Sequence, residues 1–132
     1  MTAYLLDANV LVALSLAEHE HHRRASRWLA TVERFAVCPV VEGALVRVVL
    51  RLGESPQTAA AMLRQLSEHP RGEFWPDDLS YDTVDLTAVH GHKMVTDTYL
   101  AALAVHHGGL LATLDAPLVK RLPASASLVP EV

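Results

Sequence analysis

Short apolar runs alternate along the chain with longer segments in which apolar residues recur at helical spacing. Such runs predict buried strands, and helical spacing predicts amphipathic helices. The predicted strands are residues 3–6, 35–38, 73–76 and 110–113, followed by an apolar stub at 127–129. The predicted helices are residues 10–16, 22–33, 40–52, 56–68, 84–89, 97–107 and 117–122. We therefore predict a three-layer α/β/α fold around a central, mostly parallel sheet.

Composition and charge narrow the class of protein. The 132 residues are 51% hydrophobic and 20% charged, which is typical of a globular chain, and we expect a single domain over residues 1–132. The formal net charge of −4 argues against a strongly basic nucleic-acid binder but permits an acidic metal site. A single cysteine, Cys38, excludes an internal disulfide. Neither a signal peptide nor a membrane-spanning run is evident, so we expect a cytoplasmic protein without membrane contact.

Four acidic residues stand where the predicted strands and helices meet. Asp7 and Asp115 each follow a predicted strand, whereas Glu42 and Asp97 lie at the starts of predicted helices. Asn9 and Thr96 are the N-caps that we expect for the helices at 10–16 and 97–107. Each acid alone also fits a turn or a favourable charge at a helix N-terminus. In an open parallel sheet, however, all four can face one crevice beyond the carboxyl ends of the strands.

Clustered carboxylates repel one another and raise each other's pKa values, and a hard divalent cation relieves that repulsion. Mg²⁺ or Mn²⁺ suits such ligands. A hydrated ion of this kind suits the hydrolysis of phosphodiester bonds.

Four segments resemble, in order, the signature segments of PIN domains, and most closely those of the VapC-type ribonuclease toxins of type II toxin–antitoxin pairs. They are LLDANVL at 5–11, EGALVR at 42–47, TDTYLAALA at 96–104 and ATLD at 112–115. The resemblance implies a Mg²⁺-dependent endoribonuclease, with Mn²⁺ as a possible substitute. It also implies an RNA substrate, a VapB-type antitoxin as partner and a homodimer. The apolar stripes of the helices at 22–33, 40–52 and 56–68 are expected to leave a groove for a segment of that partner.

The same resemblance implies roles for individual residues. The catalytic and metal-binding residues are then Asp7, Glu42, Asp97 and Asp115. Asn9 and Thr113 match polar positions beside the first and last of these acids, and we predict that both bind substrate. Gly43, directly after Glu42, is a local variation where a better helix former would be expected.

Basic and histidine residues supply further candidates for contact with RNA. Arg47 lies less than about two helical turns from Glu42, and His92 lies in a predicted loop before Asp97, so both are predicted to bind substrate. The arginines at 23, 24 and 27 fit either a solvated helix face or a phosphate contact. The histidines at 19, 21 and 22 have no standard zinc spacing, so we interpret them as an exposed loop. Trp28 and Cys38 are expected in the core.

Two other functions remain open at this point. An aspartate-based phosphohydrolase would use Asp7 as nucleophile, but such enzymes normally carry a second aspartate where this chain has Asn9. A receiver-like interaction domain could bind Mg²⁺ without turnover. An assay for metal-dependent cleavage of RNA would distinguish a nuclease from both of these alternatives.

Overall fold

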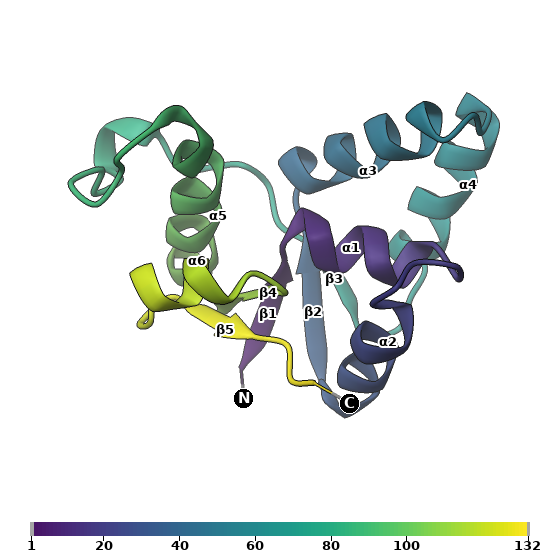
Figure 1. Cartoon of the computed structure of the whole chain (residues 1–132), viewed down its shortest axis with the longest axis horizontal. Coiled ribbons are helices and arrows are strands. Elements are labelled where there is room, and N and C mark those ends of the chain that lie inside the picture. The colour runs from purple at the N-terminus through teal and green to yellow at the C-terminus, as the bar shows by residue number, and fades with distance from the viewer. Residues whose placement is uncertain (1, 132) are drawn as a thin grey trace.

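The computed structural model describes residues 2–131 and shows one five-stranded sheet between two layers of helices (Figure 1). The strand order is β3-β2-β1-β4-β5, and every neighbouring pair is parallel. The predicted mostly parallel sheet is therefore confirmed and is parallel throughout. The strands are β1 (Ala3–Leu6), β2 (Arg34–Val37), β3 (Gly72–Phe74), β4 (Leu110–Thr113) and β5 (Ala126–Leu128).

The helices form the outer layers of the fold. One face of the sheet is covered by α1 to α4 and the other by α5 and α6, which gives the expected three layers (Figure 1). The helices are α1 (Ala8–Ser15), α2 (His22–Thr31), α3 (Pro39–Arg51), α4 (Pro56–Ser67), α5 (Val95–His106) and α6 (Ala116–Arg121). None of the helices within residues 2–131 is both long and apolar enough to cross a bilayer.

The order of the strands creates a switch point between β1 and β4. From β1 the chain proceeds through β2 to β3 at one edge, then returns across the sheet to β4 and ends in β5 at the other edge. Ligands in open α/β sheets bind beyond the carboxyl ends of the strands at such a switch point. Here those ends are followed by Asp7 after β1 and by Leu114 and Asp115 after β4.

The core lies on both faces of the central strands. Leu5 pairs in register with Ala36 on β2 and with Leu111 on β4, and all three are fully buried. Trp28 of α2 packs edge-on against Tyr4, with ring centroids 5.4 Å apart. Cys38 is also buried, as predicted. Apolar burial on both sides fixes the register of β1 and so the position of Asp7 at its end.

Three sequence predictions differ from the structure. The helix predicted at 84–89 is absent; this segment holds a turn in which Asp85 Oδ1 accepts hydrogen bonds from the amide and hydroxyl of Thr87. Such local bonds compete with helix formation. Short 3-10 turns flank the segment: η1 (Tyr81–Thr83) and η2 (His92–Met94). The helix N-caps are Asp7 for α1 and Met94 for α5, in place of Asn9 and Thr96.

The third difference concerns Arg24, which was predicted to lie on a solvated helix face or to contact a phosphate. It does neither. Arg24 is 7% exposed, and its Nε donates to the carbonyls of Val129 and Pro130 at 3.1 and 3.2 Å. Its Nη1 also lies 3.3 Å from Glu131 Oε1. Arg24 therefore fastens the C-terminal segment to α2.

Candidate active site

A buried hydroxyl joins the ends of β1 and β4 at the switch point. Thr113 donates to Oδ2 of Asp7 at 2.7 Å and accepts from Asn9 Nδ2 at 3.2 Å and from the Asp115 amide at 3.1 Å. Thr113 is fully buried, and these three bonds use its one donor and both acceptor positions. Asn9 Oδ1 closes the network by accepting from the amide of Leu114 at 3.1 Å.

Two of the predicted acids double as helix caps, which fixes their position. Asp7 Oδ1 accepts from the amide of Ala8 at 2.7 Å at the start of α1. Asp115 Oδ1 accepts from the amide of Leu118 at 3.2 Å at the start of α6. The positive end of each helix dipole favours the ionised carboxylate. The local sequence thus places two anionic groups at neighbouring strand ends.

Asp97 enters the same site from the first turn of α5. Burial, together with repulsion from Asp7 and Asp115, raises the pKa of Asp97 to about 6, while Arg121 acts in the opposite direction. Burial also raises the pKa of Asp7 above its usual value of 3.8, against hydrogen bonds from Thr113 and Ala8 that lower it, and Asp115 adds to the rise. Three of the four predicted acids therefore share one electrostatic environment.

Glu42, the fourth predicted acid, has a different charged neighbour from the other three. It lies in the first turn of α3, which follows β2 at the same edge of the sheet. Burial raises the pKa of Glu42, and the repulsive charge beside it is Asp77, not one of the other three acids. Asp77 follows β3 and was missed from the sequence, where it stands in a polar segment without periodicity. The acidic edge thus contains Asp77 in addition to the predicted four.

Neither Arg47 nor His92 belongs to the buried network. Both side chains are exposed. Arg47 lies one turn after Gly43, and its Nη1 is 3.6 Å from the point where a β-carbon on Gly43 would stand. That distance is an ordinary van der Waals contact, so the Arg47 guanidinium packs over Gly43 and an alanine would also fit at this position. His92 begins η2, on the turn that leads into α5.

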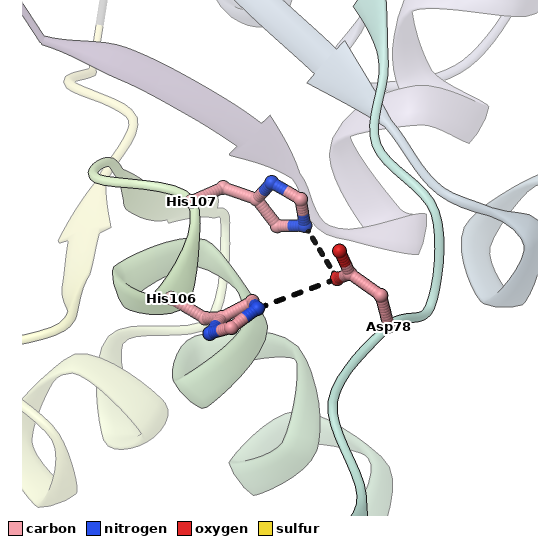
Figure 2. Close-up of side chains that lie close together, drawn as sticks. All are labelled: Asp78, His106 and His107. Carbon is pink, nitrogen blue, oxygen red and sulfur yellow. Dashed lines mark hydrogen bonds and ion pairs between the residues drawn. The ribbon is translucent and has the colours of Figure 1, made fainter.

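Residues suited to a metal ion occur in two places. Within residues 2–131, the one set of three or more histidine, cysteine or carboxylate ligands with all ligand atoms within 4.8 Å of one another is Asp78, His106 and His107 (Figure 2). The predicted acids are more widely spaced than this. The histidines at 19, 21 and 22 form no such set; instead His22 Nδ1 lies 2.8 Å from the carbonyl of Ala13.

The acid site nevertheless has the chemistry that a hydrated Mg²⁺ or Mn²⁺ ion requires. Its donors are all carboxylate oxygens, which these hard cations prefer. Mg²⁺ usually keeps several waters and takes one or two carboxylates directly, so a wide spacing of the acids suits it. Burial is the main cause of the raised pKa of Asp97, and repulsion from Asp7 and Asp115 adds to it against the opposing charge of Arg121. A divalent cation would supply the missing positive charge.

Comparison with known proteins gives the family to which the chain belongs. Residues 4–121 match the model of the PIN domain family. The chain is 48% identical to Ribonuclease VapC29 of Mycobacterium tuberculosis over 127 residues, which covers 96% of both chains. It superposes on VapC20 of M. tuberculosis, a sarcin-ricin loop cleaving toxin, with a TM-score of 0.69 at 15% identity, covering 96% of this chain and 99% of that one. It also superposes on VapBC2 from Rickettsia felis bound to a promoter DNA fragment, with a TM-score of 0.68 at 19% identity, covering 96% and 98%. The chain therefore belongs to the PIN domain family and is a homologue of the VapC ribonucleases.

Proposed function

We propose that this chain is a Mg²⁺-dependent endoribonuclease and the toxin of a VapBC-type pair, acting in the cytoplasm as one PIN domain. The observation that carries the proposal is the shared environment of Asp7, Asp97 and Asp115 at the switch point, where burial and mutual repulsion raise the pKa of Asp97 to about 6. A site of this kind favours a divalent cation and, with it, a phosphodiester substrate.

Each acidic residue has a distinct part in this proposal. Asp7, Asp97 and Asp115 would hold the ion, and Glu42, beside Asp77, would complete the acidic edge. The bound ion would help to ionise a water molecule and would offset charge that develops on the phosphate. The helix caps of Asp7 and Asp115 keep these carboxylates in place without rearrangement during the reaction.

The polar neighbours divide into positioning residues and candidates for RNA contact. The side chains of Thr113 and Asn9 form their hydrogen bonds with Asp7, Asp115 and Leu114. We therefore assign both residues a positioning role in place of the predicted contact with substrate. Arg47 and His92 are exposed and available to a phosphate. Arg47 is the stronger candidate, since its guanidinium packs over Gly43, the residue that follows Glu42 on α3.

The toxin role and the partner are supported by relatives and by a surface feature. The similarity to Ribonuclease VapC29 supports RNA as substrate, and the VapBC2 neighbour supports a VapB-type antitoxin. An apolar depression of about 370 Å³ lies between α1, α2 and α4, where Leu14, Leu29 and Met62 form part of its lining. We propose that an apolar segment of the antitoxin occupies it, and that the chain forms a homodimer.

The proposal is tested with purified protein and a defined single-stranded RNA. We expect cleavage with Mg²⁺ and none after chelation, which would exclude a non-catalytic Mg²⁺-binding module. Hydrolysis of small phosphate esters without cleavage of RNA would instead favour the aspartate-based phosphohydrolase. The toxin role predicts growth arrest when the chain is expressed alone. Co-expression with the antitoxin should yield a complex that does not cleave RNA until the partner is removed.

A further inference from the structure

We propose that Asp78, His106 and His107 form a second metal site, separate from the acid site, that binds a transition-metal ion of the Zn²⁺ class. Nε2 of His107 lies 2.8 Å from Asp78 Oδ1, and Nε2 of His106 lies 3.6 Å from the same oxygen. Figure 2 shows the two rings converging on the carboxylate from the end of α5, with Asp78 on the segment after β3. The proposal does not depend on the activity proposed above.

The donor set points to the class of ion. Two imidazole nitrogens and one carboxylate oxygen are borderline ligands that Zn²⁺, Ni²⁺ and Cu²⁺ prefer, whereas Mg²⁺ prefers oxygen alone. The three ligand atoms already lie within 4.8 Å of one another, so only a small rearrangement of the side chains brings them to one ion. Three protein ligands leave at least one position for water.

The two segments that carry the ligands, the one after β3 and the end of α5, are held in place by the surrounding structure. The segment that carries Asp78 is anchored on one side by Trp75, which is 6% exposed, and on the other by Leu79, whose carbonyl accepts from the hydroxyl of Tyr99 at 2.9 Å. Trp75 also stacks on the ring of His107, with centroids 4.9 Å apart and planes 16° apart. This stacking restricts the rotation of the His107 ring, which lowers the entropy cost of binding an ion.

The ligands remain open to solvent, so an ion can enter. The side chains of His106 and Asp78 are 43% and 47% exposed, and that of His107 is 18% exposed. A bound ion would tie the segment after β3 to the end of α5. That segment includes Asp77, the neighbour of Glu42, so the second site would stabilise one side of the acidic edge.

The test is a Zn²⁺ titration of the full chain, without a polyhistidine tag and stripped of metal, followed by calorimetry and by melting temperature. We expect one Zn²⁺ per chain, a rise in melting temperature, and binding that weakens as the solution is made acidic, because protons compete with the ion for its ligands. The variants Asp78→Asn, His106→Gln and His107→Gln should each bind at least tenfold more weakly. If His107→Gln unfolds because the stacking on Trp75 is lost, Asp78→Asn and His106→Gln still test whether the site binds Zn²⁺.

Two control variants locate the ion. His21→Gln removes a histidine from the loop between α1 and α2, and Asp97→Asn removes a carboxylate from the acid site; both should keep wild-type affinity for Zn²⁺. Binding that is lost in Asp97→Asn but kept in His106→Gln would overturn the proposal, because the ion would then occupy the acid site. Absence of binding would also overturn it and leave a histidine–aspartate ion pair.

Discussion

Thr113 donates its hydroxyl hydrogen to Oδ2 of Asp7 across the gap between two neighbouring strand ends, at 2.7 Å. The same hydroxyl accepts from Asn9 and from the amide of Asp115, so one buried group ties the Asp7 carboxylate to the backbone of Asp115. The bond also opposes the burial that raises the pKa of Asp7. Thr113 therefore positions Asp7, the acid that follows β1, and partly offsets the rise in its pKa.

Thr113→Val removes this hydroxyl and keeps the shape of the side chain. We expect RNA cleavage to fall by about 10- to 100-fold, the usual cost of losing a group that orients a metal ligand. The free energy of unfolding should fall by about 1–3 kcal/mol, because Asn9 and the Asp115 amide lose their acceptor. Cleavage rates and urea unfolding measure the two effects. Thr113→Ser keeps the hydroxyl and should stay near wild type; equal rates in the valine variant and the wild type would remove the positioning role.

Asp97→Asn should stabilise the metal-free protein at neutral pH. The pKa of Asp97 is about 6 in the folded chain against a usual 3.8, so the folded chain binds the proton more tightly. Protonation of Asp97 therefore contributes to the free energy of unfolding at low pH, and this contribution is lost as the pH rises from about 4 to about 6. After allowance for solvent screening, we expect a gain on the order of 1 kcal/mol at pH 7, or about 3–5 °C.

Melting temperatures of metal-free wild type and Asp97→Asn between pH 4 and pH 7 give the measurement. The two curves should converge toward pH 4 and separate as the pH rises. Asp82→Asn, in an exposed turn, serves as the control and should follow the wild type. Parallel curves for the wild type and Asp97→Asn would show that Asp97 is not under electrostatic strain.

Arg24→Ala should destabilise the fold without a direct effect on the site. It removes the donor to Val129 and Pro130 and leaves a gap beneath the C-terminal segment. We expect a loss of about 2–3 kcal/mol, the range for hydrogen bonds from charged groups. Arg23→Ala, at the exposed neighbouring position, should change stability by less than about 0.5 kcal/mol. Similar unfolding curves for the two variants would contradict the buried role of Arg24.

Gly109→Ala tests the close approach between β1 and the start of β4. A β-carbon at Gly109 would lie 2.2 Å from the carbonyl oxygen of Ala3 and 3.0 Å from the Trp75 ring. The backbone must therefore shift, and we expect a loss of more than about 2 kcal/mol. Gly91 has no atom within 4 Å of such a carbon and an extended φ of −175°, so Gly91→Ala should be nearly neutral. Chemical denaturation of both variants compares them directly.

The sequence alone was sufficient to predict the ends of the strands and the position of three of the acids that meet there. Asp7 and Asp115 each end a short apolar run, and parallel strands bring such positions to one edge. Asp97 was recognisable in the first turn of a helix with an apolar stripe. In these cases a local pattern and one topological rule determine the position.

The remaining features depend on contacts between segments that no local pattern connects. Asp77 lies beside Glu42 only because the chain after β3 returns over the end of β2. Asp78 and His107 are 29 residues apart. Arg24 has the spacing of a surface residue, yet the C-terminal segment covers it. The turn at 84–89 was misjudged because apolar residues at helical spacing outweighed the local hydrogen bonds of Asp85.

The central claim is that the carboxylates at the switch point cleave RNA with a divalent cation. The most direct measurement compares single-turnover cleavage of one single-stranded RNA by the wild type, Asp97→Asn and Asp82→Asn, at saturating Mg²⁺ and after chelation, with each fold checked by circular dichroism. The account predicts that Asp82→Asn cleaves like the wild type, that Asp97→Asn loses at least about 100-fold in rate, and that chelation abolishes cleavage by all three. Cleavage by Asp97→Asn at the wild-type rate, or cleavage that survives chelation, would contradict it.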